Sequence, residues 1–418
     1  MQYLYTLFIS IYGTAVSIAS VFNPKAKLFS DGRRNWESKM LKSVSKDDRI
    51  IWVHCSSLGE FEQGRPLMEK IRTDYPNHKL AVSFFSPSGY EVQKDYKGAD
   101  YIFYLPIDTI SNSKKLIRSL HPEILILVKY EYWYNLLNRL KKNRIPVIVI
   151  SAVIKEDSLF LRSYGGWFRK IICGISHFFV QEEDSKKLLN SIHVDQVTVS
   201  GDTRFDRVKE ILDSAPKLDF VEKFKANSGL IVVGSSWPED EIILADYINR
   251  QLPPDWKVIF APHNIDEKQI QQLISKLKKK ILRYTRMNEN ELENAEVLIV
   301  DTVGLLTKIY AYADISYVGG GFTKTGVHNT LEPAVFGVPL IFGPNYKQYF
   351  EAKDLVYSGA AMAYSDKNDF FRKMDELIQN EVMREERGKA GHRYIQNKPN
   401  ATGLIIGWLN DKLKTRKK

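Results

Sequence analysis

Three consecutive glycines in the second half of the chain mark a candidate ligand loop. They follow an apolar run at residues 315–318, where a glycine tolerates positive φ and lets a ligand approach the backbone. After a polar loop, Asn329 can cap a helix whose first turn carries Glu332, so that N–H groups face an anion and the carboxylate accepts ribose hydroxyl protons. The segment therefore predicts a nucleotide site, although a glycine-rich turn without a ligand has the same pattern. The three glycines are Gly319, Gly320 and Gly321.

Glu60 is the candidate general base in the first half of the chain. The apolar run at residues 50–54 leads into a turn of small residues, and Glu60 falls near the start of the helix that follows. A carboxylate placed there can remove a proton from an acceptor hydroxyl. The competing interpretation is a favourable charge against the helix dipole. The small polar residues expected on the acceptor side are Ser56, Ser57, Gly59 and, after the next strand, Ser86.

A second carboxylate, Glu131, follows the fourth expected strand and stands among aromatic residues in the sequence VKYEYWYN. An acid surrounded by aromatic rings suits sugar binding. A simple ion pair with Lys129 is the alternative.

Polar residues also follow two strands of the second half. Ser235 and Ser236 stand in the turn GSSW, and His263 stands in APHN after the next strand. All three can contact a phosphate, although turn serines and a surface histidine are common without one. The sequence has no Asp-x-Asp pair and no His/Cys cluster, so we predict no metal site, and a donor with a single phosphate suits this pattern.

Short β-rich runs alternate with helical stretches from residue 50 onward, which predicts an α/β protein with two doubly wound parallel sheets. Ligands of such sheets bind at the carboxyl ends of the strands, so we expect the active site in a cleft between two domains. The charged stretch between the two series is expected to be a linker. The strands are expected at residues 50–54, 80–84, 101–105, 124–128, 147–150, 178–180 and 197–199, and at 230–233, 258–260, 297–300, 315–318 and 340–342.

Length and charge narrow the classes of partner. The chain has 418 residues, enough for two or three domains, and its net charge of +10 favours anionic partners such as nucleotides, acidic sugars, nucleic acid or an anionic membrane. Cys55 and Cys173 show neither a disulfide framework nor a metal-ligand spacing, which fits a reducing cytosol.

The N-terminal segment is expected to associate with a membrane. Residues 2–24 carry no charged side chain, and residues 3–22 are about long enough to cross a bilayer as a helix. A weak polar stripe at Thr6, Ser10, Thr14 and Ser17 leaves open whether this helix spans the bilayer, lies in the interface or packs on protein. A cleaved signal peptide is the competing interpretation, but no Lys or Arg precedes the apolar run.

A basic cluster follows this segment and favours the cytoplasmic face of an inner membrane, because such clusters attract anionic headgroups. Its members are Lys25, Lys27, Arg33, Arg34, Lys39 and Lys42.

Seven ordered motifs extend over nearly the whole chain: SSLGE with Glu60, SPSGYE from Ser86, YEYWYN with Glu131, GDTRFDRV from Gly201, GSSWPEDE from Gly234, DTVGLL from Asp301 and GGGFTKTGVHNTLEPA from Gly319. Together they resemble the motifs of the 3-deoxy-D-manno-octulosonic acid (Kdo) transferases, membrane-associated enzymes that add Kdo to lipid A precursors.

The resemblance implies a GT-B glycosyltransferase fold, CMP-Kdo as donor, a lipid A precursor as acceptor, an inverting single displacement and no metal or other cofactor in the chemical step. It implies Glu60 as catalytic base, with Glu131 supporting the acceptor or donor site. It places Ser235, Ser236, His263, the three glycines, Asn329 and Glu332 on the CMP side. No nucleic-acid partner is implied.

The domains expected on this basis are an anchor helix at 1–24, an acceptor domain at 25–208, a linker at 209–228, a donor domain at 229–395, and a C-terminal helix with a basic tail at 396–418 that could pack back on the acceptor domain. The alternatives are another GT-B transferase or epimerase with a different nucleotide sugar, and a non-catalytic protein that binds a nucleotide sugar.

Three positions depart from the pattern of the resembling family. Pro262 stands where an Arg is common, and Leu305 and Lys129 stand where an acid is frequent. The contacts of this chain to phosphate and acceptor are therefore expected to differ in detail.

Overall fold

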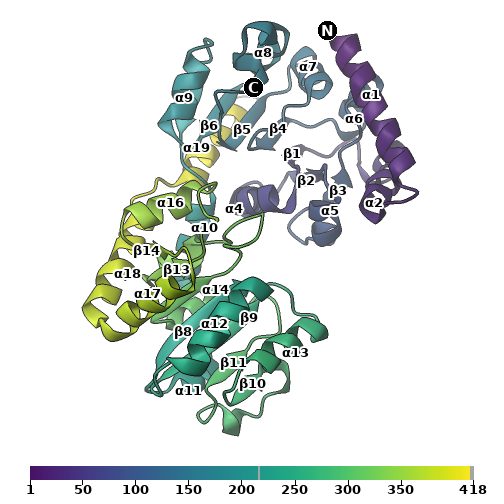
Figure 1. The fold of residues 1–418 in the computed structure, drawn as a ribbon. Coiled ribbons are helices and arrows are strands. Elements are labelled where there is room, and N and C mark those ends of the chain that lie inside the picture. Colours follow the sequence, from purple (N-terminus) through teal and green to yellow (C-terminus); the bar gives the residue numbers. More distant parts are fainter. Residues whose placement is uncertain (215–216, 415–418) are drawn as a thin grey trace. The chain divides into compact units, whose positions relative to one another are not determined.

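The computed structural model describes residues 1–214 and 217–414, and these form two compact α/β units (Figure 1). The first unit consists of residues 1–206 and 399–414, and the second of residues 207–398. Each unit is built on one seven-stranded sheet in which all the recorded strand pairs are parallel. The prediction of two doubly wound parallel sheets is confirmed.

The first sheet has the strand order β3-β2-β1-β4-β5-β6-β7. Its central strands are buried on both faces, which explains their continuous apolar runs. In β4, for example, Ile124 and Ile126 enter one core and Leu125 and Leu127 enter the other. The strands are β1 (Ile50–Cys55), β2 (Lys79–Phe84), β3 (Tyr101–Tyr104), β4 (Ile124–Val128), β5 (Val147–Ala152), β6 (His177–Val180) and β7 (Val197–Val199).

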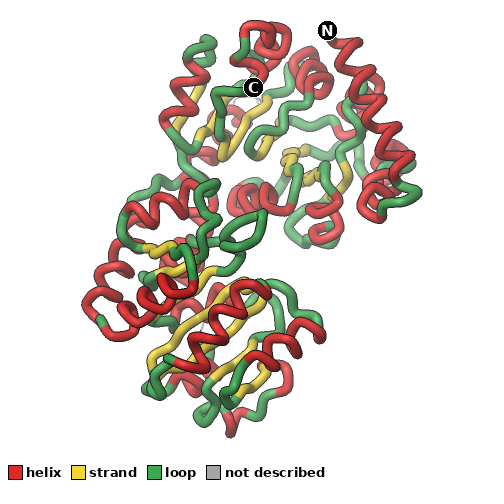
Figure 2. Tube along the Cα trace, in the orientation of Figure 1, coloured by secondary structure: helices red, strands yellow, loops and turns green. Residues whose placement is uncertain are grey.

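The helices of the first unit lie on both faces of this sheet (Figure 2). They are α1 (Gln2–Ala19), α2 (Pro24–Gly32), α3 (Trp36–Ser43), α4 (Leu58–Asp74), α5 (Pro87–Gln93), α6 (Ile110–Leu120), α7 (Tyr134–Lys142), α8 (Gly166–Ile172), α9 (Glu183–Asn190) and α19 (Ala401–Lys414), with 3₁₀ turns at Leu159–Leu161 and Ser163–Gly165.

The second sheet has the order β10-β11-β9-β8-β12-β13-β14. Its strands are β8 (Gly229–Ser236), β9 (Trp256–Pro262), β10 (Ile281–Arg283), β11 (Val297–Ile299), β12 (Ile315–Val318), β13 (Leu340–Phe342) and β14 (Ala361–Ala363). Its helices are α11 (Asp219–Lys225), α12 (Pro238–Arg250), α13 (Glu267–Lys276), α14 (Leu306–Ile309), α15 (Leu331–Val335), α16 (Phe350–Tyr357), α17 (Lys367–Gln379) and α18 (Glu381–Gln396), with 3₁₀ turns at Tyr284–Arg286, Glu289–Glu291 and Tyr310–Tyr312.

The stretch expected to be a linker, residues 209–228, is largely helical where it is described. Helix α10 (Arg204–Ser214) runs across the boundary of the units, and α11 places Val221 and Phe224 in a core of the second unit. The high charge of this stretch reflects the exposed faces of these short helices. At the other end, α19 contributes Ile405 and Leu409 to a core of the first unit. The last four residues of the basic tail, 415–418, lie outside the described residues.

Helix α1 is docked on the first unit by one face. The Tyr5 hydroxyl donates to Asp108 Oδ2 at 3.0 Å, Gln2 Nε2 donates to Asn135 Oδ1 at 3.0 Å, and Asn135 Nδ2 donates to the Thr6 hydroxyl at 2.9 Å. The rest of the polar stripe, Ser10, Thr14 and Ser17, is exposed and does not pack on protein. The three hydroxyls donate to carbonyls one turn back in the same helix. Among the helices of the described residues, none is both long and apolar enough to cross a membrane.

Arg33 is the member of the expected basic cluster whose side chain packs into the fold. The Arg33 guanidinium packs 3.5 Å over the Phe29 ring and donates to the carbonyls of Phe29, Phe85 and Leu105. Burial lowers the pKa of Arg33 to about 9. This residue therefore ties α2 to the ends of β2 and β3, whereas the five other members of the cluster are exposed.

Candidate active site

Glu60 lies in the first turn of α4, directly after β1. Its Oε2 accepts the backbone N–H of Ser57 at 3.0 Å and the backbone N–H of Ser56. Ser57 precedes the helix, so Glu60 supplies one half of a capping box, a role that the Ser57-x-x-Glu60 spacing signals in the sequence. Both recorded bonds use Oε2, which leaves Oε1 for another partner. Burial raises the pKa of Glu60, against the opposing effects of the two N–H donors and the charge of Lys129.

Glu131 is the second carboxylate of the site, just past the end of β4. Burial and the negative charge of Glu60 raise the pKa of Glu131 to about 7, and a hydrogen bond with Ser56 lowers it by a smaller amount. The two carboxylates and the Ser56 turn thus form one interacting group. Two neighbouring acids whose pKa values are both raised can divide the tasks of accepting and holding a proton.

Lys129 adopts an unusual backbone conformation between β4 and Glu131. Its φ is 68°, in the left-handed region, and its backbone N–H donates to the Ile150 carbonyl at 2.9 Å. Non-glycine residues in this region cost about 1–3 kcal/mol and occur often at functional sites. The turn at Lys129 redirects the chain so that the next residues, including Glu131, leave the sheet at its carboxyl edge.

A buried histidine fixes one aromatic side chain beside Glu131. Trp133 Nε1–H donates to His54 Nε2 at 3.3 Å, and His54 Nδ1 lies 2.9 Å from Ser83 Oγ and 3.2 Å from the Ser83 carbonyl. Burial lowers the pKa of His54 to about 3, so its ring is neutral at physiological pH. An acceptor at Nε2 puts the ring proton on Nδ1. This pair was not predicted from the sequence, because a histidine inside a strand carries no local signal.

The structure brings together the serine turns predicted for the acceptor side. The Ser86 backbone N–H donates to the Ser56 carbonyl at 2.7 Å, which joins the turn after β2 to the turn after β1. Ser86 Oγ accepts the Ser88 N–H at 3.3 Å and so caps α5. A side-chain carbon added at Gly59 would meet nothing within 4 Å, so this position borders open space.

In the second unit, three aromatic rings stack where β8 and β9 end. His263 lies 4.6 Å from Trp237 with 19° between the ring planes and 4.6 Å from His328, and Trp237 Nε1–H donates to His328 Nε2 at 2.9 Å. Burial lowers the pKa of His263 and lowers that of His328 to about 4. Both histidines are therefore neutral near pH 7. His263 was predicted as a site residue, whereas Trp237 and His328 were not.

The serines before this stack occupy a distorted strand end. The register of β8 against β9 shifts between Gly234 and Ser236, and Ser235 has a φ of 53°. Ser236 is buried, and its hydroxyl donates to Glu241 Oε1 at 3.3 Å. Ser235 is thus the more available of the two predicted serines.

The three glycines after β12 are required by the protein itself. An added side-chain carbon would come within 2.2 Å of the Ser235 carbonyl oxygen at Gly319, within 2.6 Å of the Gly326 carbonyl oxygen at Gly320, and within 2.6 Å of the Gly343 backbone at Gly321. Only Gly320 of the three has positive φ, at 90°, and its N–H donates to Asp240 Oδ2 at 2.9 Å. Close packing of backbones, and not ligand approach alone, explains why these positions are glycine.

Asn329 and Glu332 are joined at the start of α15. Asn329 Nδ2 donates to Glu332 Oε1 at 2.9 Å, and Thr307 Oγ1 donates to Glu332 Oε2 at 2.8 Å. The N-cap of α15 is Thr330, one residue later than predicted, because Asn329 Oδ1 accepts the Leu331 N–H from the position before the cap. This helix has only five residues, so its dipole is short.

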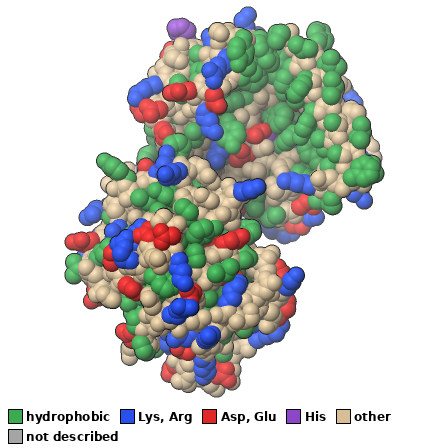
Figure 3. Space-filling view, viewed as in Figure 1, with side chains coloured by type: hydrophobic (Ala, Val, Ile, Leu, Met, Phe, Trp, Pro, Cys, Tyr) green, Lys and Arg blue, Asp and Glu red, His purple; other side chains and the backbone are tan. Residues whose placement is uncertain are grey.

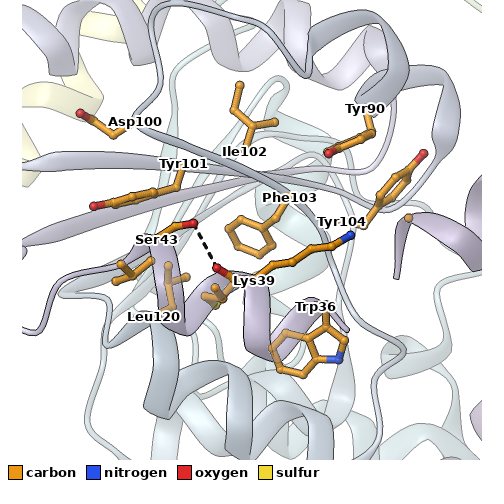
Figure 4. Close-up of a pocket in the computed structure, with 13 residues that line it drawn as sticks. Trp36, Lys39, Ser43, Tyr90, Asp100, Tyr101, Ile102, Phe103, Tyr104 and Leu120 are labelled. Atoms are coloured by element: carbon orange, nitrogen blue, oxygen red, sulfur yellow. Dashed lines mark hydrogen bonds between the residues drawn. The ribbon is translucent and has the colours of Figure 1, made fainter. Parts of the chain in front are cut away.

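One of the described cavities, with a volume of about 300 Å³, lies apart from these groups. It runs between α3 and the edge strand β3, and β2 separates that strand from β1 (Figure 4). Its lining mixes aromatic rings with the side chains of Lys39, Ser43 and Asp100. Within the described ranges, no group of three or more His, Cys, Asp or Glu side chains is placed to hold a metal ion.

Comparisons with known proteins point to one family. Residues 33–207 match the family model described as 3-Deoxy-D-manno-octulosonic-acid transferase (kdotransferase). A 3-deoxy-D-manno-octulosonic acid transferase of Chlamydia muridarum is 26% identical over 366 residues, which cover 85% of this chain and 84% of that protein. The corresponding transferase of Haemophilus influenzae is 26% identical over 375 residues, covering 86% of each chain.

A solved structure resembles the fold of this chain. The UDP-GlcNAc 2-epimerase from Neisseria meningitidis, bound to UDP-GlcNAc, matches with a TM-score of 0.58 at 16% identity and covers 87% of this chain and 100% of that chain. At this identity the likeness is one of fold.

Proposed function

The chain belongs to the 3-deoxy-D-manno-octulosonic acid (Kdo) transferase family and is a glycosyltransferase with the GT-B fold, and on this premise we propose that it transfers Kdo from CMP-Kdo to a lipid A precursor with inversion. The family connects the chain with Kdo transfer in lipopolysaccharide biosynthesis. The proposal of inverting transfer from CMP-Kdo depends on one observation. Glu60 and Glu131 form a pair at the carboxyl edge of the first sheet, where burial raises the pKa of both acids.

Glu60 acts as the general base in the proposed reaction. Its carboxylate takes the proton of an acceptor hydroxyl while that oxygen attacks the anomeric carbon of Kdo, and the bond from this carbon to the phosphate oxygen breaks. A single displacement of this kind inverts the anomeric centre, and CMP leaves with the bonding electron pair. Ser56, Ser57, Gly59 and Ser86 border the acceptor in this proposal.

The CMP moiety is proposed to bind at the carboxyl edge of the second sheet. Ser235, the neutral His263 and the turn that contains Asn329 and Glu332 lie along this edge, and Ser236 and the glycines shape the backbone beneath it. Neutral donors suit a leaving group with one phosphate, since the charge that develops on it can be stabilised by hydrogen bonds. We propose that neither a metal nor another cofactor takes part in the chemical step.

Donor and acceptor are tested together by incubating the purified protein with CMP-Kdo, formed in situ, and a tetraacylated lipid A precursor. We expect a product whose mass has increased by one or more Kdo units. A folded protein in detergent or vesicles that adds no Kdo would overturn the proposal. Epimerisation of a nucleotide sugar, the competing activity of this fold, would instead change the donor without consuming the acceptor.

We also propose that the protein works on the cytoplasmic face of the inner membrane, held there by the outer face of α1. The inner face of this helix is docked on the first unit, while apolar side chains cover its outer face, at the upper right of Figure 3. The exposed lysines of α2 and α3, and Arg34 between these helices, can attract anionic headgroups. The apolar residues exposed on and just after α1 are Tyr3, Leu4, Leu7, Phe8, Ile11, Tyr12, Ile18, Val21 and Phe22.

The double substitution Leu7→Glu and Ile11→Glu should weaken binding to vesicles of anionic phospholipid by at least about tenfold, because burying one such side chain contributes about 1.5–3 kcal/mol. Co-sedimentation with the vesicles measures this loss. Ile242→Glu, at an exposed isoleucine of α12 in the second unit, is the matched control and should bind as the unsubstituted protein does. Equal binding by the double variant would contradict a role of this face.

A further inference from the structure

A small apolar cavity separates α1 from the loops of the candidate active site. It has a volume of about 160 Å³. Helix α1 provides one wall, the turn after β2 and the loop after β3 provide the second, and the residue before α7 closes it. Its lining consists of Phe8, Ile9, Tyr12, Phe85, Ile107, Asp108 and Trp133.

Two aromatic side chains of this lining, Phe85 and Trp133, are held in place. Trp133 is fixed by its hydrogen bond to the buried His54, and its ring lies 4.4 Å from that of Phe85. These rings therefore form a rigid wall. Phe85 immediately precedes Ser86, and Trp133 follows Glu131 by two residues, so the wall is built from residues next in the chain to those of the proposed acceptor site.

Asp108, the single acidic residue of the lining, has both carboxylate oxygens hydrogen-bonded within the protein. Asp108 Oδ1 accepts from the Ser113 hydroxyl and the Leu136 N–H, and Oδ2 accepts from the Tyr5 hydroxyl and the Asn135 N–H. With both oxygens satisfied, Asp108 secures α1 and α7 on either side of the cavity. The lining left for a ligand is apolar.

The cavity is continuous with the exposed apolar face of α1. Phe8 and Tyr12 line the cavity and are 70% and 41% exposed, so their rings belong to both surfaces. An apolar chain that enters from that face would pass between these rings toward Trp133 without crossing a charged group. The larger cavity of Figure 4 offers no comparable path, because Lys39, Ser43 and Asp100 line it.

We propose that this cavity receives an acyl chain of the lipid acceptor and thereby sets which hydroxyl reaches Glu60. The inference rests on the proposed function, since it concerns the acceptor of that reaction. An acyl chain fixed against Trp133 holds the sugar above the Ser56 and Ser86 turns, so that part of the acceptor's binding energy becomes orientation of the reacting hydroxyl. Phe8, Ile9, Ile107 and Trp133 are then the residues that determine acyl-chain preference.

Ile107→Trp, which fills the cavity, tests this inference in the full chain. The measurement is KM and kcat for a series of lipid A precursors that differ only in acyl-chain length, with CMP-Kdo saturating. We expect the unsubstituted protein to have a lower KM for longer chains, and Ile107→Trp to reduce the ratio of KM values between short- and long-chain acceptors by at least about tenfold, as steric discrimination in apolar pockets does. KM for CMP-Kdo should stay the same. The control Ile242→Trp, on the exposed face of α12, should keep the ratio of the unsubstituted protein.

A second variant covers the case in which Ile107→Trp fails to fold. Ile9→Ala enlarges the cavity, and we expect it to move the preference toward longer or bulkier chains with little change in the thermal midpoint. The same chain-length ratio in the unsubstituted protein and in either folded cavity variant would overturn the inference while leaving the proposed function intact. Failure of the unsubstituted protein to transfer Kdo to any acceptor of the series would instead overturn the proposed function itself.

Discussion

Glu60→Gln should lower kcat for Kdo transfer by about 10²–10⁴-fold, the usual contribution of a positioned general base. The amide cannot take the proton of the attacking hydroxyl. It can still accept the N–H groups of Ser56 and Ser57 through its oxygen, because Gln replaces Glu in capping boxes. Folding and binding of the nucleotide should therefore persist, and rate assays with titration of CMP separate the two effects.

Glu62→Gln is the matched control for this experiment, because it makes the same change two residues later in α4, outside the turn that carries Glu60. Its turnover should equal that of the unsubstituted protein. Full turnover by Glu60→Gln would show that Glu60 serves only as a helix cap. A loss of CMP binding in parallel with turnover would show that the substitution disturbs more than proton transfer.

The fold follows from the sequence where strands are central. The run ILILV of β4 is apolar throughout because helices cover both faces of the sheet, and its bounds were predicted to the residue. The edge strands β10 and β14 were not predicted. Each has three residues, and Ile281–Arg283 is only partly buried while Ala361–Ala363 has little β propensity, so neither carries a continuous apolar signal.

The candidate site follows from the sequence only in part. The carboxyl-edge rule places Glu60 and Glu131 at ends of β1 and β4, which are paired neighbours in the sheet. The partners of the aromatic side chains could not be read in this way, because the pair of Trp133 and His54 and the pair of Trp237 and His328 each join residues about 80–90 positions apart in the sequence. Such long-range bonds depend on strand order, which local patterns do not encode.

The departure at Lys129 has a physical consequence for the neighbouring Glu60. Its positive charge opposes the burial that raises the pKa of Glu60, so a cation there keeps more of the base ionised near neutral pH. An acid at this position would add a third negative charge to the pair. The family pattern alone did not show whether a lysine at this position weakens or supports the site. The effect of its charge on Glu60 indicates that it supports the site.

Glu131→Gln should stabilise the first unit at pH 8 and at the same time impair turnover. Burial and the charge of Glu60 raise the pKa of Glu131 from its ordinary value of 4.5 to about 7, so the folded state binds a proton more tightly than the unfolded state. The free energy of unfolding consequently falls as pH rises from about 4.5 through 7, and this fall is complete above pH 7. Gln mimics the protonated form. Since one pKa unit corresponds to about 1.4 kcal/mol, the gain at pH 8 should be about 1–3 kcal/mol, and it should shrink toward zero as pH falls to about 4.

Denaturant unfolding at pH 5 and pH 8 measures this difference, and the same protein reports the role of the carboxyl group in turnover. If ionised Glu131 assists Glu60, the unsubstituted enzyme should lose activity as pH falls below about 7, and Glu131→Gln should be impaired at every pH without that inflection. Removing the Glu60 charge in Glu60→Gln should lower the pKa of Glu131 and shift the stability difference to lower pH, because that charge is the second cause of the raised value. Equal stability of Glu131→Gln and the unsubstituted protein at both pH values would show that the Glu131 carboxyl group is well solvated. There would then be no electrostatic basis for assigning Glu60 and Glu131 different roles in accepting and holding a proton.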